Sequence, residues 1–240
     1  MDSAANEQAY QPEGAGSRTL DQMTNAHNYN RWLFERVEAA LGRRVLEIGS
    51  GTGTMTDYLL DRDLVVGLEV VPEYVEELRR RYSGHPNVRI ESVDITSTSF
   101  DLRALGLDSA VSFNVFEHIP DDVGAMRQVY HALCPGGRLA LLVPAHQALY
   151  GPFDDLIGHQ RRYGKRELTE KLRSAGFHVD RVSYSNPLGA LGWLVNMRLL
   201  RQRRLNAVRV YDSLVPLLAR AERLLRPPFG LSVVAIARKP

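Results

Sequence analysis

Length, composition and charge limit the classes of protein to which this chain can belong. It has 240 residues, 44% of them apolar, and a net charge of +2 at neutral pH. This length and apolar content suffice for one substantial hydrophobic core, and α/β domains of this size commonly form a single unit. The small net charge does not indicate a nucleic-acid-binding protein. The single cysteine, Cys134, excludes an internal disulfide.

The sequence also lacks the signals of a membrane or exported protein. Asn196 and Arg198 interrupt the best candidate for a membrane span, so no apolar run is long enough to cross a bilayer. The N-terminal residues do not contain the apolar core of a signal peptide. We therefore expect a cytoplasmic protein with no transmembrane segment.

Residues 1–18 are rich in Ala, Gly, Ser, Gln and Pro and contain almost no large apolar side chains. Because such a segment cannot pack well, we expect a disordered tail ahead of a single domain over residues 19–240. Between Leu20 and Leu41 apolar residues recur near helical spacing. Asn28 opens the stronger of the helices expected there.

The most informative stretch follows a short apolar strand and contains Gly49, Gly51 and Gly53. Glycine permits positive φ and lets a ligand lie against the backbone, which is typical of a strand-to-helix turn that binds a nucleotide-like cofactor. The dinucleotide fingerprint would need its third glycine at Thr54. Glu47 would repel a diphosphate but suits a sulfonium or ammonium group, as in S-adenosylmethionine. The alternative is a tight turn that binds nothing.

The next predicted strand ends in an acidic residue. Residues 64–69 form an apolar run that ends in Glu69, about twenty residues after the first glycine, where this architecture places a ribose-binding carboxylate. A carboxylate can accept from two neighbouring hydroxyls at once. The alternative is an exposed acid at a strand end. A helix is expected over residues 73–82, with Pro72 suited to its first turn.

Two further strands are expected over residues 87–95 and 108–114. In open α/β sheets, ligands bind outside the carboxyl ends of the strands, so polar residues there are site candidates. Asp94 could accept from an adenine amino group while Ile95 packs on the ring, and Asn114 ends the fourth strand. For Asp94 a turn or cap role is the alternative, because Thr and Ser residues follow it.

In these residues the chain, from about Leu41 to Val182, resembles the class I S-adenosylmethionine-dependent methyltransferases. The resemblance rests on the glycine loop, Glu69, Asp94, the Asn-Val-Phe-Glu-His-Ile-Pro segment at 114–120 and the Leu-Cys-Pro-Gly-Gly-Arg-Leu segment at 133–139. It implies an α/β fold with a Rossmann-like, seven-stranded, mostly parallel sheet, helices on both faces and an antiparallel last strand. The Phe-Glu-His-Ile match is common in small-molecule members of the family.

The resemblance implies S-adenosylmethionine as the cofactor. In similar enzymes a helix before the first strand covers the cofactor, which makes Tyr29 a candidate contact, with plain packing as the alternative. The predicted cofactor-binding residues are Tyr29, Glu47, Gly49, Ser50, Gly51, Gly53, Glu69, Val70, Asp94, Ile95, Asn114, Val115 and Glu117. Members that methylate nucleobase or glutamine amino groups carry an Asn-Pro-Pro-Tyr type sequence in place of residues 114–117, so methylation of DNA or protein amides is disfavoured.

The acceptor side is expected in a loop over residues 144–165, after the fifth strand. Its length and its aromatic residues indicate a functional loop that packs against another surface. His118, His146 and His159 are candidate proton acceptors, since imidazole titrates near neutrality, and structural hydrogen bonding is the alternative for each. The predicted substrate-binding residues are His118, His146, Tyr150, Phe153, His159, Arg162, Tyr163, Trp193 and Met197. We predict no metal site; Asp154 and Asp155 as metal ligands are the alternative.

A helical insertion over residues 187–229 precedes the final strand, which is expected over residues 231–238. It combines Trp193 and Met197 with several arginines. Such a segment could cap an apolar acceptor pocket, form a dimer contact, contact an anionic membrane surface or simply pack on the sheet.

These observations predict methyl transfer to a small-molecule acceptor that is partly hydrophobic, in the biosynthesis of a specialised metabolite. Transfer to oxygen is preferred over transfer to nitrogen or carbon, and in-line positioning supplies most of the rate enhancement. Four alternatives stay open: a lipid-linked acceptor at the membrane, non-methylating chemistry with the same cofactor, a non-catalytic cofactor-binding subunit, and a nicotinamide dehydrogenase, which Gly53 and Glu47 oppose. The sequence does not distinguish a monomer from a homodimer.

Overall fold

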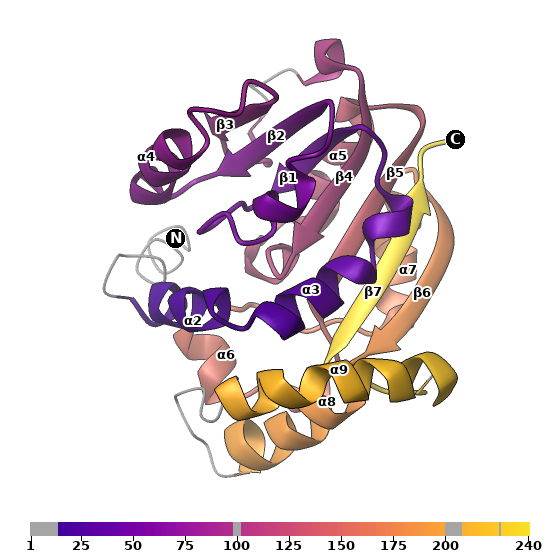
Figure 1. Cartoon of the computed structure of the whole chain (residues 1–240). Coiled ribbons are helices and arrows are strands. Elements are labelled where there is room, and N and C mark those ends of the chain that lie inside the picture. Colours follow the sequence, from indigo (N-terminus) through magenta and orange to yellow (C-terminus); the bar gives the residue numbers. More distant parts are fainter. Residues whose placement is uncertain (1–13, 98–101, 200–207, 226) are drawn as a thin grey trace.

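A computed structural model of the chain describes residues 14–97, 102–199, 208–225 and 227–240, without the side chains of 197–199, 223 and 225. Its centre is a seven-stranded sheet in the order β3-β2-β1-β4-β5-β7-β6 (Figure 1). The strands are β1 (Arg44–Ile48), β2 (Leu64–Glu69), β3 (Val88–Ser92), β4 (Leu107–Phe113), β5 (Leu133–Pro144), β6 (His178–Ser185) and β7 (Ser232–Arg238). The pairs among β1 to β5 are parallel, whereas β7 runs antiparallel to β5 and β6. The predicted sheet is thereby confirmed.

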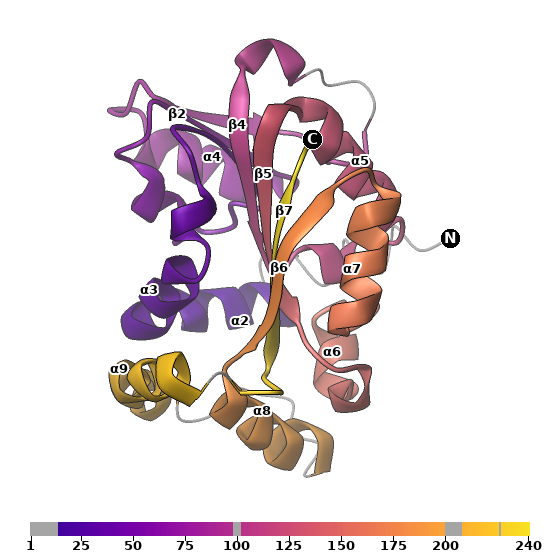
Figure 2. The same ribbon diagram turned by 90° about the vertical axis from the view of Figure 1, so that its right-hand side faces the viewer.

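The inner strands are buried at most positions, as expected for strands that lie between two layers of helices. Every residue of β2 is buried, and so is every residue of β7 except Arg238. The outer strands β3 and β6 contain exposed residues among their buried and partly buried ones. A strand buried on both faces needs helices on both sides, and Figure 2 shows α5 and α7 on one side of the sheet with α3 on the other.

Helix periodicity explains how each layer meets the sheet. In α5 (Asp122–Ala132), Ala125, Met126 and Val129 fall on one face and join the core beneath the sheet, as does Leu168 of α7 (Lys165–Ser174). On the opposite face, α3 (His27–Glu35) buries its apolar residues in a second cluster with the side chains of the same strands. Helix α4 (Pro72–Arg81) packs against the edge strand β3.

Helix α2 (Ala15–Thr24) begins inside the segment 1–18 for which the sequence predicts a disordered tail. Gly16 and Ser17 are buried, and Thr19 Oγ1 donates a hydrogen bond to Ala15 O at 2.8 Å. The composition of this stretch was a misleading guide, because small side chains carry little apolar area yet allow close packing. Residues 1–13 lie outside the described residues, so the tail itself stays a prediction.

The predicted loop over residues 144–165 has structure of its own. It contains the short helices η5 (Gln147–Leu149) and α6 (Pro152–Leu156) before α7 begins. The insertion consists of α8 (Pro187–Trp193), which continues into the π-helix η6 (Leu194–Leu199), and of α9 (Val208–Leu225). Figure 1 shows α8 and α9 with α2 beyond the carboxyl ends of the parallel strands. In the parts of the chain that the structure describes, no helix is long and apolar enough to cross a bilayer.

Candidate active site

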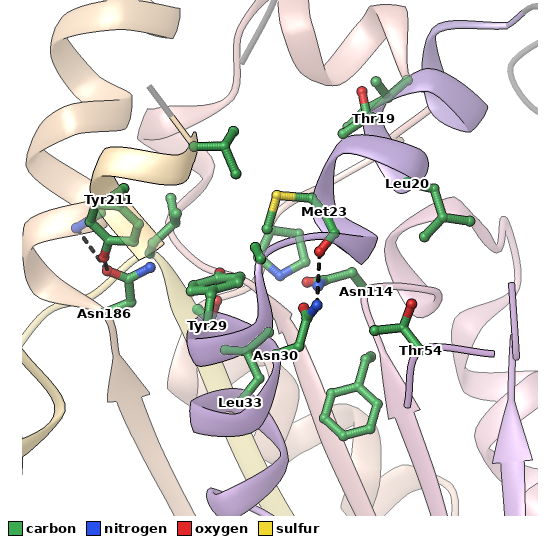
Figure 3. A pocket seen from close by; sticks show the side chains of 18 of the residues that line it. Thr19, Leu20, Met23, Tyr29, Asn30, Leu33, Thr54, Asn114, Asn186 and Tyr211 are labelled. Carbon is green, nitrogen blue, oxygen red and sulfur yellow. Dashed lines mark hydrogen bonds between the residues drawn. The ribbon is translucent and has the colours of Figure 1, made fainter. Parts of the chain in front are cut away.

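A cavity of about 580 Å³ lies beyond the carboxyl ends of the parallel strands. Its walls come from α2, the loop after β1, α3, the end of β4, α6, α8 and α9, and most of the lining side chains are apolar. Figure 3 shows Leu20 and Met23 of α2, Tyr29 and Leu33 of α3 and Tyr211 of α9 around this space. An apolar cavity with a few convergent polar groups is typical of a small-molecule site.

Two glycines of the loop after β1 could not be replaced without strain. Gly49 and Gly51 have φ values of +76° and +53°, in the left-handed region that favours glycine. A Cβ on Gly49 would lie 2.4 Å from Val115 Cγ2, and one on Gly51 would lie 3.0 Å from Leu20 Cδ2. Both glycines and Ser50 line the cavity. The loop therefore presents bare backbone to a ligand, as the sequence predicts.

The regular helix expected after this loop is not present. Only a 3₁₀ helix, η2 (Thr56–Leu59), separates the loop from β2. Threonine hydroxyls form local hydrogen bonds instead, for example between Thr52 Oγ1 and Thr54 Oγ1 at 3.0 Å, and such bonds compete with helix formation. Anion binding by a long helix N-terminus is therefore not available at this turn.

Glu69 holds the glycine loop in place. Its Oε2 accepts from Gly51 N at 2.7 Å, and its Oε1 accepts from Val70 N and Val71 N at 2.7 and 2.9 Å. A carboxylate has about four lone-pair sites, so these three bonds leave one for a further donor such as a ribose hydroxyl. The ribose contact, like that of the exposed Val70, stays a prediction.

Glu47 is buried beneath the same loop. Its Oε2 accepts from Thr56 Oγ1 at 2.6 Å and from Ser50 Oγ at 3.0 Å, whereas Oε1 has no hydrogen-bond partner among the described residues. Burial raises the pKa of Glu47 to about 7. A nearby cation would favour the ionised form, so the predicted contact with the charged end of the cofactor stays a prediction with one oxygen available for it.

Asp94 performs the turn role that the sequence left open as the alternative. Its Oδ1 accepts from both Thr96 N and Thr96 Oγ1 at 2.8 Å. Asp94 and Ile95 line a separate pocket of about 290 Å³ and do not line the main cavity. Their predicted contact with adenine stays a prediction.

The end of β4 meets the glycine loop directly. Asn114 lines the cavity and has a φ of +53°, which is uncommon for a residue with a side chain. Its backbone N–H donates to Leu142 O at 2.8 Å, and the next side chain, Val115, covers Gly49. Strained backbone of this kind clusters at functional sites. Asn114 therefore belongs to the wall of the candidate cofactor site, and Val115 packs against the glycine loop.

Beyond the loop, Asp154 organises a buried polar cluster. Its Oδ1 accepts from His159 Nδ1 at 2.8 Å and from Arg162 Nε and Nη2 at 2.8 and 2.7 Å. The Arg162 guanidinium lies 4.3 Å from the centre of the Trp193 ring, and Trp193 meets Phe153 edge to face at 5.3 Å. His159, Arg162, Trp193 and Phe153 all line the cavity.

Burial controls the charge of the groups next to this cluster. It lowers the pKa of His159, and it lowers the pKa of His118 to about 3, with the neighbouring His159 adding to the effect. With their pKa values lowered, the imidazoles of His118 and His159 are both neutral at neutral pH. Burial also raises the pKa of Glu117 to about 8. Because the Nδ1–H of His159 donates to Asp154, its Nε2 carries the lone pair, 3.6 Å from Glu117 Oε1.

Three other residues predicted for the acceptor side do not line the cavity, and a fourth has a side chain that the structure does not describe. The His146 ring stacks on Tyr184 at 4.5 Å and does not line the cavity. The hydroxyl of Tyr150 bonds to Asp155 Oδ1 and His159 O, both at 2.6 Å. The buried Tyr163 hydroxyl lies 2.9 Å from Phe116 O. These tyrosines fix the loop, and the side chain of Met197 is outside the described residues.

The sequence did not identify several residues that line the cavity and come from α2, from the end of β6 and from α9. Asn186, with a φ of +66°, accepts from Gly189 N at 2.7 Å and from the Tyr211 hydroxyl, and both Asn186 and Tyr211 line the cavity (Figure 3). Asp212 accepts from Tyr29 N at 2.8 Å and ties α9 to α3. An Asn before a Pro at a strand end is a helix-cap signal that could have identified Asn186; Tyr211 and Asp212 carried no such signal.

Comparison with known proteins agrees with this geometry. A family model described as a methyltransferase domain matches residues 46–139. A relative from Mycolicibacterium smegmatis, described as a probable S-adenosylmethionine-dependent methyltransferase, is 32% identical over 173 residues, which make up 69% of this chain and 65% of the relative. Aklanonic acid methyltransferase DauC from a Streptomyces species is 28% identical over 161 residues, or 64% of this chain and 72% of DauC.

This chain spans only 45% of the length of another relative, a 37.1 kDa protein in a transposon of Streptomyces fradiae, to which it is 29% identical over 64% of its own length. Two solved structures share the fold. An S-adenosylmethionine-dependent methyltransferase from Mesorhizobium loti has a TM-score of 0.58 at 18% identity, with 87% of this chain and 98% of that one covered. The [4+2]-cyclase SpnF has a TM-score of 0.60 at 19% identity, with 89% and 80% covered.

The fold and the glycine loop define an α/β protein that binds a nucleoside-type cofactor. The methyltransferase-domain match and the relatives above support a class I S-adenosylmethionine-dependent methyltransferase, and they imply S-adenosylmethionine as the cofactor. The residues present fit that cofactor, because Gly49 and Gly51 offer backbone where a Cβ would fill the cradle.

Proposed function

We propose that this protein transfers the methyl group of S-adenosylmethionine to a small-molecule acceptor bound in the cavity. The observation that carries the proposal is that one cavity extends from the backbone of Gly49 and Gly51 to the side chains of His159 and Trp193. S-adenosylmethionine supplies an activated methyl group, so the protein's main contribution is to hold the acceptor in line with it and to exclude water. A continuous space next to the cofactor loop suits that task.

The lining supports a partly hydrophobic acceptor. Leu33, Phe113 and Phe153 contribute apolar surface, and Trp193 and Leu188 of α8 close the same space, as expected if the insertion over residues 187–229 caps the acceptor. The name of the relative DauC refers to aklanonic acid, and this supports a specialised metabolite as the acceptor here.

Transfer to oxygen is the preferred reaction in this proposal. A hydroxyl must lose its proton when it is methylated, whereas a neutral amine attacks before it loses one. His159 is a neutral group on the cavity wall that can take such a proton, whereas the pKa of about 3 makes His118 a weak base. His159 is the better oriented of the two, because Asp154 fixes its tautomer.

The proposal is tested by incubating the purified protein with S-adenosylmethionine and a panel of hydroxylated, amino and carbon-acid acceptors of graded hydrophobicity. We expect S-adenosylhomocysteine to form in proportion to acceptor, with the methyl group on oxygen by mass spectrometry. Gly51→Val should abolish turnover, while His178→Gln, at an exposed position on β6, should retain it. Cofactor binding without any product across the panel would contradict methyl transfer.

A second candidate keeps the cofactor but not the methyl transfer. SpnF, which shares the fold, is described as a [4+2]-cyclase, and this supports other chemistry as an alternative. It would be favoured if an acceptor were converted in the presence of S-adenosylmethionine while no S-adenosylhomocysteine formed.

A third candidate is methylation of a lipid-linked acceptor at a membrane surface. Leu191 and Val195 of the α8–η6 helix and Leu214 and Leu217 of α9 are 50%, 48%, 49% and 67% exposed. Exposed apolar side chains in such number on adjoining helices are typical of an interaction surface. Co-sedimentation with anionic vesicles that Leu191→Glu and Leu217→Glu abolish would favour this candidate, and no co-sedimentation would exclude it.

A further inference from the structure

Three side chains bring potential metal-ligand atoms together beside the cavity, which two of them, His118 and His159, line. Glu117, His118 and His159 each offer one such atom, and these atoms all lie within 4.8 Å of one another. Glu117 and His118 belong to the short helix η4 (Phe116–His118) after β4, whereas His159 follows α6. Gln160 N donates to Glu117 O at 2.9 Å and locks the two segments together.

Both imidazoles have the outer contacts that orient metal-binding histidines. The Nδ1–H of His159 donates to the Asp154 carboxylate at 2.8 Å, and the Nδ1–H of His118 donates to Gly158 O at 3.1 Å. Each bond assigns the neutral tautomer whose Nε2 carries the lone pair. Metal-bound histidines almost always donate their other N–H to a carboxylate or a carbonyl in this way.

Glu117 has an unusual environment for an acid. Its side chain is fully buried, and neither carboxyl oxygen has a hydrogen-bond partner among the described residues. The nearby guanidinium of Arg162 uses Nε and Nη2 for Asp154, and its positive charge acts on Glu117 without a hydrogen bond between them. A carboxyl group buried in this way stays a neutral acid unless an opposite charge or a metal ion stabilises its ionised form.

We propose that Glu117, His118 and His159 bind one divalent transition-metal cation at the wall of the cavity. Two imidazoles and one carboxylate suit Zn²⁺, Mn²⁺, Fe²⁺ or Co²⁺ and leave coordination positions open, as catalytic metal sites require. Ligands about 2.1 Å from a tetrahedral metal are about 3.4 Å apart, so the three side chains need to close in by a little over an ångström. His118 and His159 both line the cavity.

The role of this cation rests on the proposed function. A bound divalent cation lowers the pKa of an oxygen that coordinates it. An acceptor hydroxyl on the metal would release its proton to solvent and attack the methyl group as the alkoxide. In this arrangement His118 and His159 act as ligands, and acidification by the metal replaces proton acceptance by His159.

The test is a titration of the full-length, chelator-treated protein with Co²⁺, followed by its visible absorption. We expect ligand-field bands that saturate at one equivalent and disappear when Zn²⁺ is added. His159→Gln and Glu117→Gln should each weaken binding by at least about 100-fold. His178→Gln, at a histidine with a side chain that is 63% exposed, is the matched control and should bind as the wild type does.

Two variants keep the test valid if one does not fold, and circular dichroism identifies a variant that fails. Absence of saturable bands, or equal binding by His159→Gln and the wild type, would overturn the site. Metal binding and methyl transfer are read separately. Cobalt binding without S-adenosylhomocysteine formation would contradict the proposed function alone, and full turnover by the chelator-treated protein would contradict the metal's role.

Discussion

The cofactor side and the acceptor side of the cavity are built in different ways. On the cofactor side the surface is mainly backbone: Gly49 and Gly51 form it, and Glu69 holds it by accepting a hydrogen bond from the backbone N–H of Gly51. On the acceptor side, Asp154, Arg162 and Trp193 come from separate elements and meet through their side chains. A local backbone motif can be recognised in a sequence, whereas a constellation of distant side chains cannot.

The largest effect is expected where the acceptor side depends on a buried ion pair. Arg162→Met would leave Asp154 buried without its guanidinium, and breaking such a pair costs about 3–5 kcal/mol. Urea unfolding measures this loss. Arg166→Met is the control, because the Arg166 side chain is 94% exposed and its pairing with Glu170 is worth at most about 0.5 kcal/mol. Similar losses in the two variants would refute the distinction.

On the cofactor side, Gly51→Val should cost binding and leave the fold intact. Its Cβ would meet Leu20 at a φ of +53°, and we expect the Kd for S-adenosylhomocysteine to rise by at least about 100-fold, or about 2.7 kcal/mol. Calorimetry measures the Kd. Gly136→Ala provides a matched control: φ is +80° and the space around it is open, but it does not line the cavity. Unchanged binding by Gly51→Val would count against the site.

These two regions also differ in how far the sequence predicted them. The strands and the glycine loop were predictable because apolar runs and glycine spacing are local properties, whereas the antiparallel last strand was expected only from the family resemblance. His146 and His159 lie in the same loop and look equivalent in sequence. Only the fold shows that a φ of +61° sends His146 to Tyr184, while Asp154 holds His159 at the cavity.

The same limit applies to the aromatic residues of the acceptor side. Phe153 and Tyr163 are ten positions apart, yet the first lines the cavity and the second is buried against Phe116. Tyr211 of α9 reaches the cavity through its contact with Asn186. Which face of a helix meets the cavity depends on tertiary packing, and no spacing rule in the sequence supplies it.

A pH dependence distinguishes the buried acid of the cofactor side. The pKa of Glu47 is about 7 in the folded protein and 4.5 ordinarily, so the folded state holds the extra proton between these values. The contribution of Glu47 is therefore full below about pH 4.5 and is lost as the pH rises through about 7. The stability of the wild type relative to Glu47→Gln should fall by up to about 1.4 kcal/mol per pH unit in that window.

Urea unfolding of both proteins at pH 5, 6 and 7 measures this difference without interference from the histidines, which both proteins share. A difference that is constant with pH, or that increases as the pH rises, would show that Glu47 is ionised in the folded protein.

The smallest effect is expected for Trp193→Ala on the acceptor side. It removes the ring that covers Arg162 and meets Phe153, and we expect the KM for an acceptor to rise by about 5–10-fold, or about 1 kcal/mol. The Kd for S-adenosylhomocysteine should not change. Leu217→Ala, at a side chain that is 67% exposed on α9, is the control with an unchanged KM. If Trp193→Ala raised the Kd for S-adenosylhomocysteine more than the KM for the acceptor, the cofactor side and the acceptor side would not be separate.

The most direct test of this division is a crystal structure of the protein with S-adenosylhomocysteine. The account predicts the nucleoside against the backbone of Gly49 and Gly51, with its sulfur facing the part of the cavity lined by His159 and Trp193. A molecule bound at another pocket, or with its sulfur turned away from that space, would contradict it.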